Sequence, residues 1–292
     1  MTDAFWIILT GTLIAAGGGL LGTFLLLRRM AMVGDAIAHA VLPGIVIAFL
    51  VAGSRESVVI VPAAAATGVL TTLLIEWLHT RLRVQSDAST GIVFTGLFAL
   101  GVVLISVFAD SVDLDQDCVL YGEIAFVPLD IVTLGGRWEM PRSPLVIGLL
   151  LVPIVAIVLR GFKGFQVTSF DPAFASAAGI RSGLWHYALM AMVSVMTVAA
   201  FEAVGAVLVV AFLVVPAATA VLLSQRLKHI LLLSVIIGFA ASASGYALAV
   251  SFDVSVAGSM AVASGILFFL TLLVLSVRRR SKKPLLFNSR IG

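Results

Sequence analysis

The feature that most constrains this chain is a series of long apolar runs separated by short polar breaks. A helix that crosses a membrane needs roughly 20 consecutive apolar residues. Only 11% of the residues are charged, whereas soluble domains carry about 25%. The sequence therefore predicts an all-α, polytopic membrane helix bundle that forms a single domain over residues 1–292. The predicted spans are 5–27, 33–53, 58–78, 91–109, 144–160, 185–200, 204–223, 230–250 and 255–277.

The number of spans depends on residues 185–223, one long apolar run interrupted by Glu202 and Gly205. Two short spans with a turn give nine helices in total, and one long helix gives eight. Basic residues concentrate in cytoplasmic segments. Nine spans place fifteen of the eighteen Lys and Arg residues on one side, with only Arg55, Arg137 and Arg142 on the other. This distribution favours nine spans and predicts that the basic tail 278–292 is cytoplasmic.

The opposite side is predicted to be acidic, because seven Asp and Glu residues lie in the loop 110–143. Within this loop the segment YGEIAFVPLDIV, residues 121–132, is amphipathic and is expected to pack against the bundle as a short helix. The nearby DLDQDC does not match a calcium-binding loop, because Cys118 and Ile124 stand where that loop requires Gly and Glu. The loop is therefore interpreted as an acidic rim that attracts cations weakly.

A candidate metal site lies in MVGDAIAHAVLPG, residues 32–44. Asp35 and His39 are four residues apart and so project from one face of a helix. A carboxylate and an imidazole together make half of a site for a divalent transition metal. The residues alone leave two readings equally open, a ligand pair or a helix-capping Asp beside a His that bonds a carbonyl. A symmetric dimer would supply two such pairs at its axis.

The segment FDPAFASAAGI, residues 170–180, predicts a short capped helix. Asp171 is a good N-cap, Pro172 suits the first helical position and Gly179 suits the end. Such a helix is too short to span, and the basic residues around it place it at the cytoplasmic face. It is either a contact for an ATPase or a connector without a partner.

Proline inside a span removes a backbone hydrogen bond, so Pro43 and Pro216 are predicted hinges. Pro216 lies in VGAVLVVAFLVVPAATA, residues 204–220. Glu202 at the outer end of that segment is interpreted as an interfacial turn residue or as part of a permeation path.

Several activities are excluded by missing motifs. The chain has no GxxxxGK[ST] and so cannot hydrolyse ATP through a P-loop. It also lacks HExxH and GxSxG, and no basic patch with interleaved aromatics indicates nucleic-acid binding. We therefore predict a protein that is not an enzyme, holds no permanent cofactor and has no nucleic-acid partner.

In their order along the chain, GDAIAHAVLPG, FDPAFASAAGI and AVGAVLVVAFLVVPAATA resemble the permease subunits of bacterial ABC importers for manganese, zinc and iron. The resemblance covers about residues 10–277, and DCVLYGEIAFVPLD is more similar to the manganese-type members. It implies a type II-like permease in the bacterial cytoplasmic (inner) membrane that transports Mn2+, Fe2+ or Zn2+. It also implies separate ABC ATPase subunits, an extracytoplasmic metal-binding protein, and a second permease chain, identical or related.

The resemblance further implies roles for individual residues. Asp35 and His39 would contact metal in the membrane path, although Ala38 stands where many members have serine. The residues implied to contact the ATPase are Phe170, Asp171, Pro172, Phe174, Ala175 and Gly179. Three alternatives stay open, namely a proton-coupled secondary transporter using Asp35 and Glu202, an intramembrane enzyme, and a type II permease for a metal chelate.

Overall fold

Helices make up nearly all of the computed structural model, which describes residues 3–52, 57–108, 123–134 and 138–281. The helices are α1 (Asp3–Leu27), α2 (Val33–Ala40), α3 (Leu42–Ala52), α4 (Ser57–Arg81), α5 (Ser86–Phe108), η1 (Ile124–Leu129), α7 (Arg142–Arg160), α8 (Phe162–Phe170), α9 (Pro172–Ala177), α10 (Ser182–Val204), α11 (Ala206–Leu223), α12 (Leu227–Phe252) and α13 (Val256–Ser281). Eight spans in the described part, counting α2 with α3 as one, are long and apolar enough to cross a membrane. With the 25-residue α4, each of the nine predicted spans has a counterpart, and the predicted helix bundle is confirmed.

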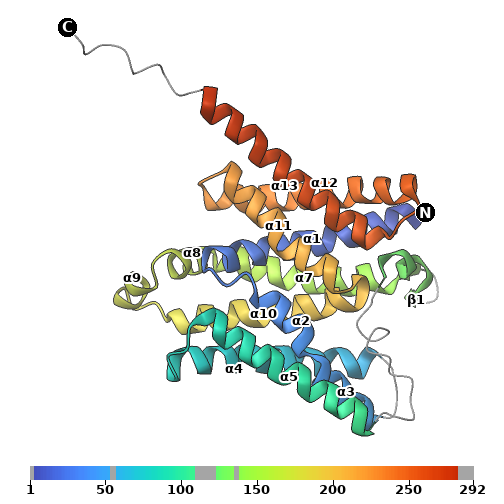
Figure 1. Ribbon diagram of the computed structural model, residues 1–292, viewed down its shortest axis with the longest axis horizontal. Coiled ribbons are helices and arrows are strands. Elements are labelled where there is room, and N and C mark those ends of the chain that lie inside the picture. The colour runs from blue at the N-terminus through green and yellow to red at the C-terminus, as the bar shows by residue number, and fades with distance from the viewer. Residues whose placement is uncertain (1–2, 53–56, 109–122, 135–137, 282–292) are drawn as a thin grey trace.

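The long helices lie side by side across the molecule (Figure 1). Helix α1 packs against α7, α11 and α12, and α10 packs against α4. Helices α2 to α5 form one flank of the bundle and α11 to α13 the other. The small residues of α1 allow close packing, since a Cβ at Gly22 would collide with the backbone carbonyl of Leu213 on α11. Helix α1 is therefore the central element of the fold.

The turn between α10 and α11 is confirmed at Gly205. This residue has φ +77° and ψ 169°, a conformation that an L side chain disfavours. Helix α10 ends at Val204 and α11 begins at Ala206. The alternative of one long helix over residues 185–223 is therefore wrong, because this backbone conformation at Gly205 interrupts the helix.

The second predicted span, residues 33–53, was wrong as a single helix. The structure divides it into α2 and α3, with Val41 between them. Pro43 follows two residues later and has no N–H with which to bond the carbonyl of His39. The helix is therefore interrupted directly after the candidate metal site, whereas Pro43 lies in the first turn of α3 and its role as a hinge stays a prediction.

The segment 121–132 contains a short helix, but the all-α prediction missed the hairpin that follows. The helix is η1, a 3-10 helix in which Ile124 and Val127 are buried. Strands β1 (Ile131–Leu134) and β2 (Trp138–Pro141) then pair antiparallel, with Ile131 opposite Pro141. β-Branched residues favour this strand, but four residues are too few to give a periodic signal. The acidic residues 110–117 and Cys118 lie outside the described residues.

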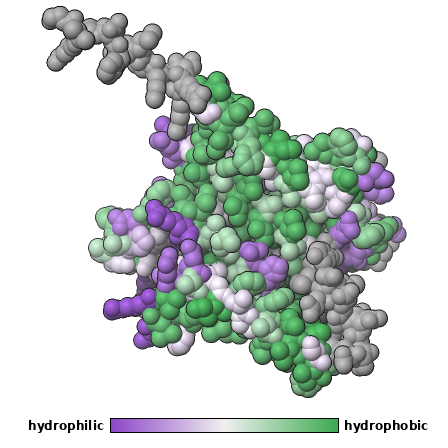
Figure 2. Space-filling model, viewed as in Figure 1, coloured by the Kyte–Doolittle hydropathy of each residue, from purple (hydrophilic) through white to green (hydrophobic). Residues whose placement is uncertain are grey.

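The polar surface agrees with a membrane protein. Hydrophilic residues gather towards the two ends of the helices, and a broad hydrophobic band lies between them (Figure 2). A small hydrophilic patch interrupts this band over α2. At the C-terminus, α13 extends through Ser281, so the predicted tail begins as helix and residues 282–292 lie outside the described part. The chain is a multi-pass membrane protein.

Candidate functional site

Helix α2 is buried on all sides except where Asp35 and His39 lie. The other six of its eight residues are buried, because α2 packs against α4, α5, α10 and α11. The side chains of His39 and Asp35 are 33% and 37% exposed. Ala38 is fully buried and does not reach this opening. The surface of α2 is therefore accessible at one place, the opening formed where the Asp35 carboxylate and the His39 imidazole are partly exposed.

The two side chains face one another without a tight bond. His39 Nε2 lies 3.6 Å from Asp35 Oδ1, which is longer than a good hydrogen bond. The His39 ring packs beside two aromatic rings of α5, with centroid separations of 5.6 Å to Phe94 and 6.2 Å to Phe98. A loosely paired carboxylate and imidazole keep lone pairs free for a cation.

Asp35 and His39 by themselves are too few ligands for a metal site. In the described ranges, no group of three or more His, Cys, Asp or Glu side chains is placed to hold a metal ion. Glu202 is exposed near the last turn of α10, and the structure does not bring it together with Asp35 and His39. Its role in the path stays a prediction. Any further His, Cys, Asp or Glu ligand for a cation at α2 would have to come from another chain or from residues outside the described part.

Packing against α11 determines how α2 lies. A Cβ at Gly34 would collide with the Leu213 side chain, so glycine beside Asp35 allows the two helices to approach. Pro216 is buried inside α11, which is one uninterrupted helix over its 18 residues. Proline at this position cannot donate to the Phe212 carbonyl. The predicted hinge at Pro216 is therefore a missing hydrogen bond and not a break, and its movement stays a prediction.

The predicted short capped helix is the six-residue α9, and Phe170 of the predicted segment is the last residue of the preceding α8. The Phe174 N–H donates to Asp171 Oδ1 at 2.9 Å, and Pro172 occupies the first turn of α9. Gly179 ends the helix with φ +78°. The N–H groups of Gly179 and Ile180 bond back into the last turn, the hydrogen-bond pattern of a Schellman motif. The predicted N-cap and C-terminal glycine are confirmed.

Helix α9 lies at one edge of the molecule (Figure 1). Phe170 and Phe174 are 59% and 60% exposed, and Asp171 and Pro172 beside them are also exposed. Ala175 is fully buried and anchors the helix. Exposed aromatic side chains on a capped, protruding helix are typical of a surface that another protein covers.

A partly buried polar network, which no motif in the sequence indicated, lies beside α9. The Arg28 guanidinium follows α1 and donates to three side chains. Its Nε bonds Ser169 Oγ and its Nη2 bonds Thr168 Oγ1, each at 3.0 Å. Its Nη1 lies 3.3 Å from His186 Nδ1 on α10. His186 Nε2 in turn lies 3.1 Å from Glu76 Oε2 on α4. The network joins α4, α8 and α10 to the end of α1.

The donors and acceptors of these side chains indicate the direction of the hydrogen bonds in this network. Arginine has no acceptor, so His186 must accept at Nδ1 and carry its proton on Nε2. That proton is then donated to Glu76. Burial lowers the pKa of Arg28, but a guanidinium stays charged in proteins. His186 therefore lies between a cation and a carboxylate, and the three groups line a cavity of about 570 Å3 with Pro172 and Ser182. The one sequence signal for this network was Glu76, an isolated Glu near the end of the predicted span 58–78.

Comparison with known proteins gives one consistent result. The family model for the ABC 3 transport family matches residues 2–275. The chain is 49% identical to the manganese transport system membrane protein MntD of Bacillus subtilis, covering 92% of this chain and 90% of that protein. It is 39% identical to the zinc transport system membrane protein TroD of Treponema pallidum, covering 91% and 72%.

Among solved structures, PsaBC from Streptococcus pneumoniae in complex with Fab matches with a TM-score of 0.74 and 30% identity. The match covers 93% of this chain and 91% of the PsaBC chain. Agreement in sequence and in fold thus extends over nearly the whole chain. The chain therefore belongs to the ABC 3 transport family of membrane proteins.

Proposed function

We propose that this chain is the permease subunit of an ATP-driven importer of divalent transition metal ions, and that Mn2+ is the ion it carries in preference to Zn2+ or Fe2+. The observation that carries the proposal is the opening on α2, where Asp35 and His39 are the two residues that packing leaves partly exposed. Carboxylate with imidazole is a ligand set for these ions. The similarity to MntD, a manganese transport system protein, supports manganese, and the similarity to TroD, a zinc transport system protein, keeps zinc as the second candidate.

The half-exposed pair fits a gate that two permease chains share. Two chains related by a two-fold axis present the same surface to each other. Each would then contribute one Asp35 and one His39, giving two carboxylates and two imidazoles around one ion. The break at Val41 and the missing hydrogen bond at Pro43 would let α2 move relative to α3 as the gate opens.

Power would come from separate ATPase subunits, because the sequence has no P-loop. Helix α9 is the surface proposed to receive them, with Phe170 and Phe174 as apolar contacts. A metal-binding protein outside would deliver the ion. Closure of the ATPases would move α9 and, through α8 and α10, re-aim the helices around α2. The proposed location is the bacterial cytoplasmic membrane.

The test is uptake of Mn2+, Zn2+ and Fe2+ by cells that express the complete transporter with wild-type, Asp35→Ala or His39→Ala permease. Loss of uptake of one ion in both variants, with normal amounts of permease in the membrane, is expected. His229→Ala is the matched control, because His229 is an exposed histidine in the first turn of α12. Normal uptake in His39→Ala cells would show that the pair is structural.

A second experiment separates this proposal from a proton-coupled transporter. An ATPase subunit whose P-loop lysine is replaced should abolish uptake at an unchanged membrane potential. Uptake that persists with that ATPase and stops when the proton gradient is dissipated would contradict an ABC importer. Uptake only of a metal–chelate complex would instead favour the permease for a metal chelate.

A further inference from the structure

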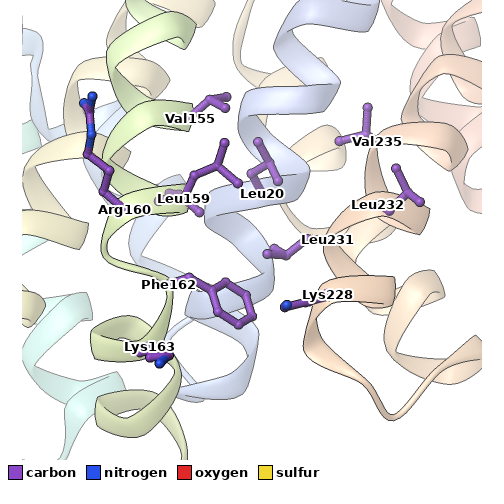
Figure 3. Close-up of a pocket in the computed structure, with 11 residues that line it drawn as sticks. Leu20, Val155, Leu159, Arg160, Phe162, Lys163, Lys228, Leu231, Leu232 and Val235 are labelled. Carbon is purple, nitrogen blue, oxygen red and sulfur yellow. The ribbon is translucent and has the colours of Figure 1, made fainter.

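A groove separates α12 from α7 and α8 on the surface of the bundle, far in sequence from the candidate metal site (Figure 3). Its volume is about 690 Å3, within the range of roughly 300–1,000 Å3 typical of small-molecule sites. Leu20 of α1 forms its floor, because α1 packs against both α7 and α12. The apolar wall residues are Val155, Val158 and Leu159 from α7 and Leu231, Leu232 and Val235 from α12.

The walls are apolar and open to the surroundings. Leu159 and Leu232 are 69% and 62% exposed, and both helices are candidate membrane spans. At the depth of the membrane such side chains contact hydrocarbon. A concave apolar surface at this depth is suited to a single acyl chain lying along it.

Positive charge is concentrated at one end of the groove. Lys163 from α8 and Lys228 from α12 lie there on opposite walls (Figure 3). The Lys228 ammonium extends toward Phe162 and lies 5.7 Å from the centre of its ring. Arg160 also lines the groove, but its guanidinium extends away from it. Among the described residues that line the groove, none is acidic.

The positive end of a helix dipole adds to this charge. Helix α12 begins at Leu227, and the N-cap residue before it, Arg226, makes no side-chain hydrogen bond to the first turn. The first N–H groups of a helix attract anions. Because this end of the helix is positive, the charge of Lys228 in the first turn destabilises α12. An anion beside Lys228 would offset that destabilisation.

We propose that this groove binds one anionic phospholipid of the cytoplasmic leaflet. The phosphate would lie between Lys163 and Lys228, and one acyl chain would follow the apolar walls toward Val155 and Val235. The basic end of the groove is the predicted cytoplasmic side, and basic pockets between membrane helices on that side suit anionic head groups. The lipid would hold α8, the element that leads into α9, against α12.

The experiment measures lipid binding to the intact transporter complex by native mass spectrometry. Phosphatidylglycerol and phosphatidylcholine with the same chains are added in turn. Selective binding of phosphatidylglycerol is expected, and Lys163→Gln and Lys228→Gln should each weaken it by about fivefold. The matched control is Arg81→Gln with Arg83→Gln, two exposed basic residues at the end of α4 and just after it, on the same predicted side but outside the groove lining. An equal loss in the control pair would overturn the proposal.

A second variant tests the apolar part of the site. Val235→Trp should fill the groove and lower phosphatidylglycerol binding while leaving both lysines in place. Glycerol phosphate, which has the head group without chains, should not compete. Competition by glycerol phosphate or by inorganic phosphate would show a simple anion site instead. Equal binding of the two lipids, or no bound lipid because another subunit covers the groove, would also overturn the proposal.

Discussion

Replacing Arg28 with methionine is expected to destabilise the fold by about 2–3 kcal/mol. Methionine keeps the apolar length of the side chain but removes the charge and the hydrogen bonds to Ser169, Thr168 and His186. A hydrogen bond contributes about 1 kcal/mol in soluble proteins and about 0.6 kcal/mol on average between membrane helices. Three such bonds give the stated range.

The measurement is equilibrium unfolding of the purified chain in mixed detergent micelles. The matched control is Arg29→Met, because Arg29 is the next residue in the chain and is exposed. Its backbone is left-handed, with φ 59°, and the substitution does not change this requirement. A change within about 0.5 kcal/mol is expected there. Equal destabilisation by the two substitutions would refute the network.

A double-mutant cycle tests whether His186 transmits the interaction between Arg28 and Glu76. Glu76→Gln keeps an acceptor for His186 Nε2 but removes the negative charge. Groups in one hydrogen-bond network show interaction energies of about 0.5–3 kcal/mol. A coupling energy near zero for Arg28→Met and Glu76→Gln would mean that the two charges are independent. Metal uptake and ATPase activity, measured on the same variants, would then show whether breaking the network uncouples transport from ATP hydrolysis.

The remaining predictions concern single local features. Asp171→Ala should lower the stability of α9 by about 1 kcal/mol through loss of its N-cap, with weaker ATPase co-purification, whereas Asp171→Asn should keep both. Gly205→Ala should lower the free energy of unfolding by about 1–2 kcal/mol, because the φ of +77° at Gly205 is left-handed. An unfolding curve that does not change would contradict this argument. Gly22→Ala should cost about 1–3 kcal/mol, since the new methyl group meets the Leu213 carbonyl. The control for that experiment is Gly96→Ala, where a Cβ meets nothing within 4 Å, so a similar loss there would contradict the packing argument.

Features that depend on local sequence were predictable. The spans follow from runs of apolar residues, because a membrane selects length and hydropathy. The turn at Gly205 and the ends of α9 at Asp171 and Gly179 follow from residue types with particular backbone requirements. The Asp35–His39 face follows from helical periodicity alone.

Tertiary structure decided what these elements bring together. Packing of α2 against four neighbours leaves only Asp35 and His39 partly exposed on that helix, and no periodicity in the sequence indicates which residues those neighbours cover. The Arg28 bonds join residues 141 and 158 positions apart. The groove described above likewise joins α7 and α8 with α12. The sequence by itself determined which segments cross the membrane, because that choice is local. Only the folded chain decided which polar groups meet, because those distances depend on how separate helices pack.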